Sequence, residues 1–191
     1  MLIFIHGFNS AGNSDKAVRL KIEFSELQAL TPTCPYTPDD AIAVLRNLIE
    51  NGQRSGETVT VIGSSLGGYY AVWLAYQYKL PCILINPLVD QTLLRLEIGP
   101  QQNYYTNEQY EWTSNHCDQL DLMAVNPTTL AVKPLLLLDE GDELLDSHLA
   151  AAHFGGLAET HLFPGGSHRF EHMDQALPLI RSYITSCDKT D

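Results

Sequence analysis

The chain has 191 residues, 45% of them hydrophobic, a size and composition that predict one domain over residues 1–191 with a sizeable buried core. Its 11 Lys and Arg residues face 23 Asp and Glu residues, which gives a formal net charge of −12 at pH 7. Because this charge repels polyanions, we expect no nucleic-acid partner.

Cysteine usage and hydropathy predict a soluble cytoplasmic protein. The four cysteines lie far apart without C-x-x-C or zinc-like spacing, so we expect reduced packing residues at Cys34, Cys82, Cys117 and Cys187. The apolar residues 1–5 run directly into His6, without the basic leader or the small-residue cleavage site of a signal peptide. No run approaches the roughly 18 apolar residues of a membrane helix, so we expect no membrane insertion.

The first predicted strand covers residues 2–5, which are all apolar and typical of a strand buried on both faces of a parallel sheet. It ends in the loop 6–10, at the edge where open α/β sheets bind ligands. The backbone amide of Phe8 is a candidate hydrogen-bond donor to an oxyanion at this edge. The alternative is a plain loop with His6 as a buried structural residue, and for His6 we favour that alternative.

Two covering helices are predicted next. Residues 13–15 offer N-cap chemistry, and apolar residues then recur at helical spacing: Ala17, Val18, Leu20, Ile22, Phe24 and Leu27. Residues 28–38 are rich in Pro and Thr and predict a loop with a short edge strand. A second helix begins at Asp39-Asp40, and the pair Asn51-Gly52 predicts its end.

Residues 59–76 predict a strand, a sharp turn and a helix. The turn matches G-x-S-x-G, the nucleophile elbow, in which glycines let the backbone fold tightly and expose a serine hydroxyl at the head of a helix. The spacing selects Ser65, because a motif centred on Ser64 would have Ile and Leu at the glycine positions. The amide of Leu66 would then point at the site of an oxyanion. The alternative is an ordinary turn in which either serine caps the helix.

Residues 80–86 predict another buried strand, and the alternation of strands and helices predicts a mostly parallel sheet with helices on both faces. Residues 88–131 contain no convincing buried strand, and we interpret them as a small cap over a pocket. Its aromatic residues are candidates for substrate binding: Tyr104, Tyr105, Tyr110 and Trp112. The alternative is a surface excursion whose aromatic side chains pack only against the sheet edge.

An acidic loop follows the next predicted strand, residues 134–138. Asp142 comes after Gly141, which can turn the chain inward, whereas Asp139 still belongs to the end of the strand. Asp142 is therefore the candidate carboxylate partner of the serine site, and Asp139 is kept in reserve. Four acids in five residues also fit an ordinary solvated loop.

The last predicted strand, residues 159–163, follows a helix over 146–153 and leads into a loop that brings His168 to the same sheet edge as a candidate base. His168 and His172 stand four apart, as in a metal site on one helix, but no third ligand has suitable spacing, so no metal is expected. The final helix is predicted over 170–187, with a fraying charged tail. Other histidines are expected at the surface: His148, His153 and His161.

Ser65, Asp142 and His168 follow one another in the order of an α/β-hydrolase triad. In such a triad His168 takes the proton from Ser65, Asp142 holds the imidazole, the amides of Phe8 and Leu66 bind the oxyanion, and no cofactor is needed.

The chain resembles an α/β-hydrolase over nearly its whole length. Residues 5–10, the elbow 63–68 and the loop 141–143 together resemble the small bacterial YqiA-like esterases. The resemblance implies a three-layer α/β fold with Ser65 as nucleophile, Asp142 as acid and His168 as base. It also implies a small-molecule acyl ester or acyl thioester as substrate.

Charge favours one kind of leaving group. Six acids face Arg95 and Lys133 between residues 87 and 133, which gives the cap a net charge near −4. This charge repels the phosphates of coenzyme A unless a local basic patch compensates, so we expect neutral carboxylic esters, with acyl-CoA thioesters as the alternative. A different class remains open, a non-catalytic ligand- or partner-binding protein on the hydrolase fold.

Overall fold

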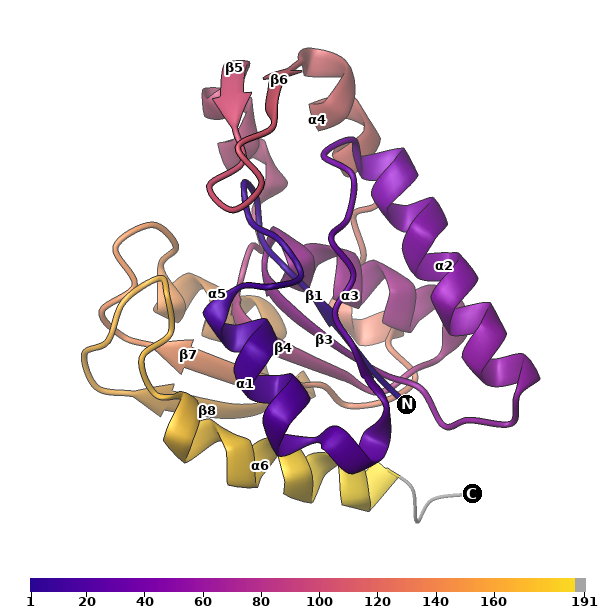
Figure 1. Cartoon of the computed structure of the whole chain (residues 1–191). Helices are drawn as coiled ribbons and strands as arrows, with labels where there is room; N and C mark the ends of the chain where they lie inside the picture. Colours follow the sequence, from indigo (N-terminus) through magenta and orange to yellow (C-terminus); the bar gives the residue numbers. More distant parts are fainter. Residues whose placement is uncertain (188–191) are drawn as a thin grey trace.

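A six-stranded parallel sheet forms the centre of the molecule (Figure 1). The structure is a computed structural model that describes residues 1–187. The strand order is β2-β1-β3-β4-β7-β8, and every neighbouring pair is parallel. The strands are β1 (Leu2–Ile5), β2 (Ala29–Leu30), β3 (Thr60–Ser65), β4 (Cys82–Pro87), β7 (Leu135–Asp139) and β8 (Glu159–Phe163). The predicted parallel sheet is confirmed.

Helices cover both faces of this sheet and complete the predicted three layers (Figure 1). The helices α1 and α6 pack on one face, and α2, α3 and α5 pack on the other. Their bounds are α1 (Asp15–Glu23), α2 (Pro38–Arg54), α3 (Leu66–Tyr78), α5 (Ser147–Phe154) and α6 (Met173–Cys187). Short 3₁₀ segments follow α1 (Ser25–Leu27) and α5 (Gly155–Leu157).

The two covered faces of the sheet explain why its central strands are largely apolar. In β1, Leu2 and Phe4 enter the core beneath α1 and α6, whereas Ile3 and Ile5 enter the core beneath α2 and α3. Side chains alternate between faces along a strand, and here both faces are covered by helices. Both sets of side chains in the middle of each central strand therefore contact an apolar core.

The cap predicted over residues 88–131 lies between β4 and β7. It contains a 3₁₀ stretch (Gln91–Glu97), the antiparallel strands β5 (Gly99–Gln102) and β6 (Gln109–Trp112), the helix α4 (Ser114–Asp121) and a 3₁₀ turn (Pro127–Thr129). Leu94, Trp112 and Leu120 are buried and join the core on the α2 and α3 side. The cap therefore has buried residues of its own and is more than a surface excursion.

The first helix differs from its prediction at two positions and at its end. Val18 is 45% exposed and Ile22 is 72% exposed, so both side chains face solvent. Only Ala17 and Leu20 of α1 are buried, because a helix this short presents a narrow stripe to the sheet. The regular helix ends at Glu23, and Phe24 is buried beyond it.

The second helix does not end at Asn51-Gly52 as predicted, but continues to Arg54. Gly52 lies inside the helix, and a Cβ there would come within 2.1 Å of Met1 Cε. Gly52 therefore does not terminate the helix, and the Met1 side chain packs against it. The helix starts at Pro38, a favoured first position because its missing N–H has no partner there anyway.

Other expectations concern cysteines, hydropathy and the C-terminus. Cys34, Cys82 and Cys117 are buried packing residues, as predicted. Among residues 1–187, no helix combines the length and the hydropathy that crossing a bilayer requires. The helix α6 begins at Met173, three residues later than predicted. The tail that was expected to fray lies outside the described residues.

Close backbone contacts hold α3 against the sheet at the predicted elbow. A Cβ on Gly63 would lie 2.1 Å from Gly67 O, and a Cβ on Gly67 would lie 2.1 Å from Ile5 O. Both neighbouring atoms are backbone atoms, which cannot move away as a flexible side chain does. Glycine at these positions therefore lets β3 turn directly into α3.

We predict that Gly63→Ala lowers the free energy of unfolding by about 2–4 kcal/mol, because the added methyl group overlaps the backbone of α3. Urea denaturation followed by circular dichroism measures the loss. The control is Gly156→Ala, where a Cβ meets nothing within 4 Å and no positive φ is required. Equal stability of the two variants would contradict this account of the elbow.

Candidate active site

The predicted elbow places Ser65 at the junction of β3 and α3. Its φ of 56° and ψ of −124° are unusual for a residue with a side chain and store about 1–3 kcal/mol of strain. Ser65 stands at the N-cap of α3, yet its side chain makes no capping hydrogen bond. The alternative in which Ser65 merely caps the helix is therefore wrong. Its hydroxyl remains available to another partner.

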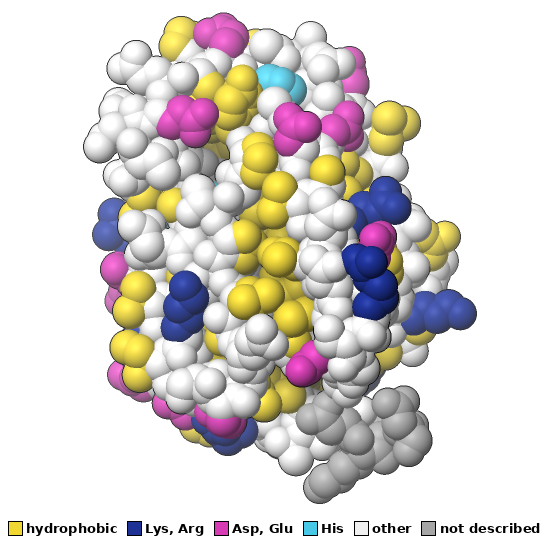
Figure 2. All heavy atoms as spheres, turned by 45° about the vertical axis from the view of Figure 1, so that its right-hand side comes forward, with side chains coloured by type: hydrophobic (Ala, Val, Ile, Leu, Met, Phe, Trp, Pro, Cys, Tyr) yellow, Lys and Arg dark blue, Asp and Glu magenta, His cyan; other side chains and the backbone are white. Residues whose placement is uncertain are grey.

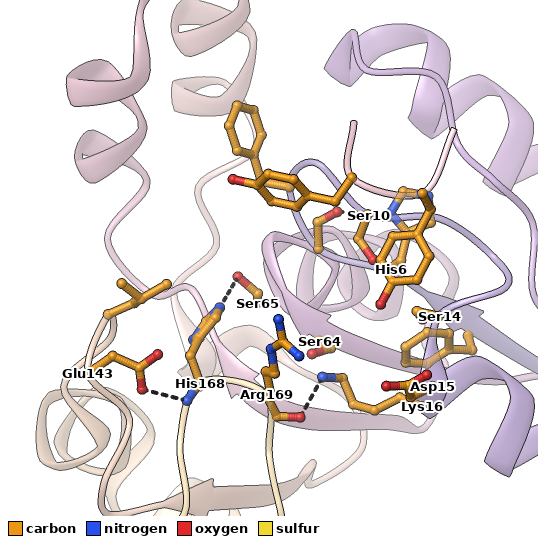
Figure 3. Close-up of a pocket in the computed structure, with 16 residues that line it drawn as sticks. His6, Ser10, Ser14, Asp15, Lys16, Ser64, Ser65, Glu143, His168 and Arg169 are labelled. Carbon is orange, nitrogen blue, oxygen red and sulfur yellow. Dashed lines mark hydrogen bonds between the residues drawn. The ribbon is translucent and has the colours of Figure 1, made fainter. Parts of the chain in front are cut away.

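That partner is His168, and the structure brings together the three residues that the sequence singled out. His168 Nε2 lies 3.1 Å from Ser65 Oγ, and His168 Nδ1 lies 2.9 Å from Asp142 Oδ2. Figure 3 shows the imidazole and the Ser65 hydroxyl pointing toward each other. A carboxylate can only accept, so Nδ1 carries the proton and Nε2 is free to accept one from Ser65.

Asp142 is fixed by the backbone around it. Its side chain is almost fully buried, and Oδ1 accepts hydrogen bonds from the amides of Leu144 at 2.9 Å and Leu145 at 2.8 Å. These donors stabilise the carboxylate that His168 contacts. The acidic loop is therefore not an ordinary solvated loop at this position.

Asp139, the reserve acid, has a different partner. It is fully buried, and its carboxylate accepts from the amides of Ser167 and Glu171 and lies 2.8 Å from His172 Nδ1. His168 and His172 thus each contact a separate carboxylate. Across residues 1–187, no group of three His, Cys, Asp or Glu side chains could hold a metal ion.

The loop that carries His168 is held by side chains from three other parts of the chain. Asn86 Nδ2 donates to Ser167 O at 3.0 Å, and Lys16 Nζ donates to Arg169 O at 2.9 Å. The amide of His168 donates to Glu143 Oε2 at 3.0 Å, and this hydrogen bond lowers the pKa of Glu143. Sequence reasoning missed all three side chains, since Asn86 merely seemed to end a strand and Glu143 stood beside the chosen acid.

The two predicted oxyanion donors belong to residues close to Ser65 in the chain or in space. Leu66 is the first residue of α3, so its amide has no partner within the helix. Gly7 precedes Phe8, and a Cβ on Gly7 would lie 3.4 Å from Ser65 Oγ. Among the described residues, neither the Phe8 nor the Leu66 amide donates a hydrogen bond to the chain.

His6 is structural, as the sequence favoured. It is buried, and its Nε2 accepts from the Cys34 amide at 3.0 Å while Nδ1 lies 2.9 Å from Gly7 O. Burial lowers the pKa of His6, because the charged imidazole would lose its hydration. The neutral ring therefore joins the loop after β1 to the segment that precedes α2.

A cavity of about 470 Å³ opens onto Ser65 and His168. Tyr104 and Tyr105, two of the aromatic candidates, line it. Tyr110 lies beside a smaller neighbouring cavity and stacks on Tyr36 with ring centroids 4.2 Å apart.

Trp112 does not line either cavity, so its prediction as a substrate contact is wrong. It is fully buried, and its indole N–H donates to Leu94 O at 3.0 Å. Its ring packs edge-on against Phe8, with centroids 5.0 Å apart. A tryptophan offers more apolar area than any other residue, and the small cap uses this area as its own core. Trp112 therefore supports the Phe8 loop from behind.

The cap hairpin is tied to the loop 8–10. Asn9 donates through Nδ2 to Gln101 Oε1 at 2.8 Å and accepts at Oδ1 from Tyr110 OH at 2.5 Å. Asn103 Nδ2 donates to Ser10 O at 2.7 Å, and the Tyr104 amide donates to Asn9 O at 3.0 Å. The segment that offers the Phe8 amide thus takes its position from the cap.

The acidic character predicted for the cap is visible on the surface. Figure 2 shows several acidic side chains and no Lys or Arg at the upper end of this face, the end at which the cap lies in Figure 1. On the cap, Arg95 donates to Asp118 and Asp121 and is neutralised by them. The cap therefore presents a negative potential to approaching anions.

Comparison with known proteins gives a family and a fold. The family model described as "Uncharacterised protein family (UPF0227)" matches residues 1–185. A UPF0227 protein of Vibrio cholerae is 25% identical over 186 residues, covering 96% of this chain and 98% of the relative. One of Serratia proteamaculans is 23% identical over 192 residues, covering 97% and 99%.

Solved structures show the α/β-hydrolase fold. Est1E from Butyrivibrio proteoclasticus has a TM-score of 0.77 at 13% identity, over 97% of this chain and 86% of that one. A monoacylglycerol lipase of Paleococcus ferrophilus has a TM-score of 0.73 at 13% identity, over 97% and 93%. Mouse alpha/beta hydrolase domain-containing protein 10 has a TM-score of 0.69 at 16% identity, over 100% and 90%.

We predict that Asp139→Ala lowers the free energy of unfolding by about 3 kcal/mol, because it leaves two backbone amides and His172 without their buried acceptor. Thermal and urea denaturation measure this loss. The control is Glu140→Ala, which removes an exposed carboxylate next to it in sequence. A loss of less than about 1 kcal/mol for Asp139→Ala would contradict the structural role of this acid.

Proposed function

The chain belongs to the UPF0227 family, and we propose that it is a serine esterase that cleaves carboxylic acyl esters through an acyl-enzyme intermediate on Ser65. One observation carries the proposal. The Ser65 hydroxyl, the His168 imidazole and the Asp142 carboxylate form one line of hydrogen-bonding contacts at the elbow. This is the arrangement that turns a serine hydroxyl into a nucleophile.

In the first half of the reaction, Ser65 Oγ attacks the ester carbonyl carbon while His168 Nε2 accepts the hydroxyl proton. Asp142 stabilises the imidazolium cation that forms. The tetrahedral intermediate then collapses, the bond from the carbonyl carbon to the alcohol oxygen breaks, and His168 returns the proton to the departing alcohol. A water molecule reverses these steps on the acyl-enzyme and releases the carboxylic acid. The sequence of steps needs no cofactor.

The amides of Phe8 and Leu66 are the proposed oxyanion donors. Each such donor contributes on the order of 3 kcal/mol to transition-state stabilisation in comparable sites. The positive end of the α3 dipole adds to this field, because Leu66 is the first residue of that helix. Neither amide has a hydrogen-bond partner among the described residues, and this supports the role.

The proposed substrate is a small acyl ester. The cavity of about 470 Å³ has the size of small-molecule sites. The structural neighbours include Est1E with bound ferulic acid and a monoacylglycerol lipase, which supports ester chemistry. Tyr104 and Tyr105 would contact the substrate at the cavity wall. The acidic cap favours an ester over a coenzyme A thioester, whose phosphates it repels.

We predict that Ser65→Ala abolishes both labelling by a fluorophosphonate probe and hydrolysis of a short p-nitrophenyl ester. The matched control is Ser64→Ala, the neighbouring serine in the same elbow, which should keep more than about a tenth of the activity. Labelling of the wild type is the expected result and would be lost only in the first variant. A well-folded wild type that stays unlabelled would instead favour the non-catalytic binding protein.

We also predict that substitution of the two buried acids, Asp142 and Asp139, lowers kcat to very different extents. Asp142→Asn should lower kcat by roughly 10³–10⁴-fold, because the amide cannot hold His168 in the required tautomer. Asp139→Asn keeps the shape of a side chain that does not contact His168, so kcat should fall by less than about a hundredfold. Stopped-flow or steady-state kinetics measure both. The reverse ranking would make Asp139 the acid of the site.

A further inference from the structure

The same cavity contains two cations that the proposed chemistry does not use. Arg169 and Lys16 line it together with Ser64 and Ser65 (Figure 3). In the figure the Arg169 guanidinium points up into the cavity toward the two serines, and the Lys16 ammonium group lies just below it. Both side chains therefore belong to the wall of the cavity that a bound ester would occupy.

Arg169 differs from the other arginines among residues 1–187. Each of the others donates to a partner in the chain: Arg19, Arg46, Arg54, Arg95 and Arg181. The guanidinium of Arg169 has no hydrogen bond or ion pair within the described residues, although acids outnumber bases two to one in the sequence. Its fork of N–H donors is free to bind a planar carboxylate.

Lys16 also lacks a carboxylate partner within ion-pair distance in the described part of the chain. Its ammonium group donates to Arg169 O at 2.9 Å, which leaves two further donors. Burial lowers the pKa of Lys16 to about 8; the charge of Asp15 raises it, the positive charge of Arg169 lowers it, and the charges of Asp139 and Asp142 raise it. A bound anion would stabilise this partly desolvated cation.

Ser14, two residues before Lys16, adds polar character to this wall of the cavity. Ser14 is buried and lines the cavity, and its hydroxyl has no hydrogen-bond partner among residues 1–187. Ser14 is the N-cap residue of α1, so the free amides and positive dipole end of that helix lie beside it. An unpaired buried hydroxyl is rare and destabilising unless something else satisfies it.

Two acids also line the cavity, and neither neutralises this group. Glu143 accepts the hydrogen bond from the His168 amide on the other side of the cavity. Asp15 makes no ion pair with Lys16, and in Figure 3 its carboxylate lies beyond the Lys16 stem as seen from Ser65. Neither acid forms an ion pair with Arg169 or Lys16 among the described residues.

We propose that Arg169 and Lys16 bind a carboxylate group of the substrate, so that the preferred ester is a small one bearing a free acid. The inference rests on the proposed esterase function and names its substrate class. It replaces the expectation of a neutral ester, because the compensating basic patch lies inside the cavity while the acidic cap lies above it. The two cations can bind one carboxylate group. The acidic cap would still repel a polyphosphate such as the one in coenzyme A.

The test compares each acidic ester with its neutral carboxamide. One pair, 4-acetoxybenzoate and 4-acetoxybenzamide, carries the acid on the leaving group, and the other, monoethyl succinate and ethyl succinamate, carries it on the acyl group. For each pair the selectivity is the ratio of kcat/KM for the acid to kcat/KM for the amide. In at least one of the two pairs, the wild type should hydrolyse the acidic ester with a higher kcat/KM than the neutral amide. Arg169→Gln should lower this selectivity about tenfold.

Controls separate charge from structure. Arg169→Lys should retain most of the selectivity, Lys16→Gln should lower it, and Arg54→Gln, at the far end of α2, should leave it unchanged. High salt should reduce the selectivity of the wild type. If Lys16→Gln also disturbs the His168 loop, hydrolysis of the neutral amides will fall in parallel, and the ratio still reports the charge effect.

Calorimetric binding of 4-hydroxybenzoate and of succinate to Ser65→Ala protein provides a measurement that needs no catalysis. At least one of these two acids should bind, and adding Arg169→Gln should weaken its binding about tenfold; this result supports the carboxylate site. Unchanged selectivity and unchanged binding in that variant, with the neutral esters still hydrolysed, would overturn this inference and leave the esterase proposal standing. If the acids bind but the protein neither hydrolyses esters nor reacts with the fluorophosphonate probe, the carboxylate site would stand and the esterase proposal would fall.

Discussion

The contact between His168 and Ser65 joins side chains that are 103 residues apart in sequence, and the whole site depends on the loop that makes it possible. This loop has no regular secondary structure to hold it. Asn86 at the end of β4, Asp139 at the end of β7 and Lys16 at the start of α1 bind its backbone instead. The parallel sheet matters to the site mainly because it brings these strand ends together.

Strained backbone conformations and buried carboxylates lie at the same edge of the sheet. Ser65, Asn86 and Phe170 all have a positive φ, which residues with side chains seldom adopt. Asp139 and Asp142 are buried carboxylates, and each is surrounded by hydrogen-bond donors that offset the loss of its hydration. The large apolar cores on both faces of the sheet stabilise the fold enough to hold these costly features in place.

Much of this arrangement could be predicted from the sequence because it depends on local patterns. Apolar runs predicted the strands, G-x-S-x-G predicted the elbow at Ser65, and Gly141 distinguished Asp142 from Asp139. The exposed face of α1, the continuation of α2 past Gly52 and the burial of Trp112 could not be predicted in this way. Each depends on which surface a residue meets in three dimensions, and a glycine inside a helix cannot be told by sequence from one that ends a helix.

The bonds between the cap hairpin and the loop 8–10, together with the packing of Trp112 on Phe8, make the cap part of the wall of the site. The Tyr104 side chain at the cavity is 78% exposed, whereas the hairpin that carries it is tied to the loop 8–10 by hydrogen bonds. The same coupling sets a rule for protein engineering. A chimera that exchanges this cap for one from a relative has to transplant residues 8–10 with it as a single module.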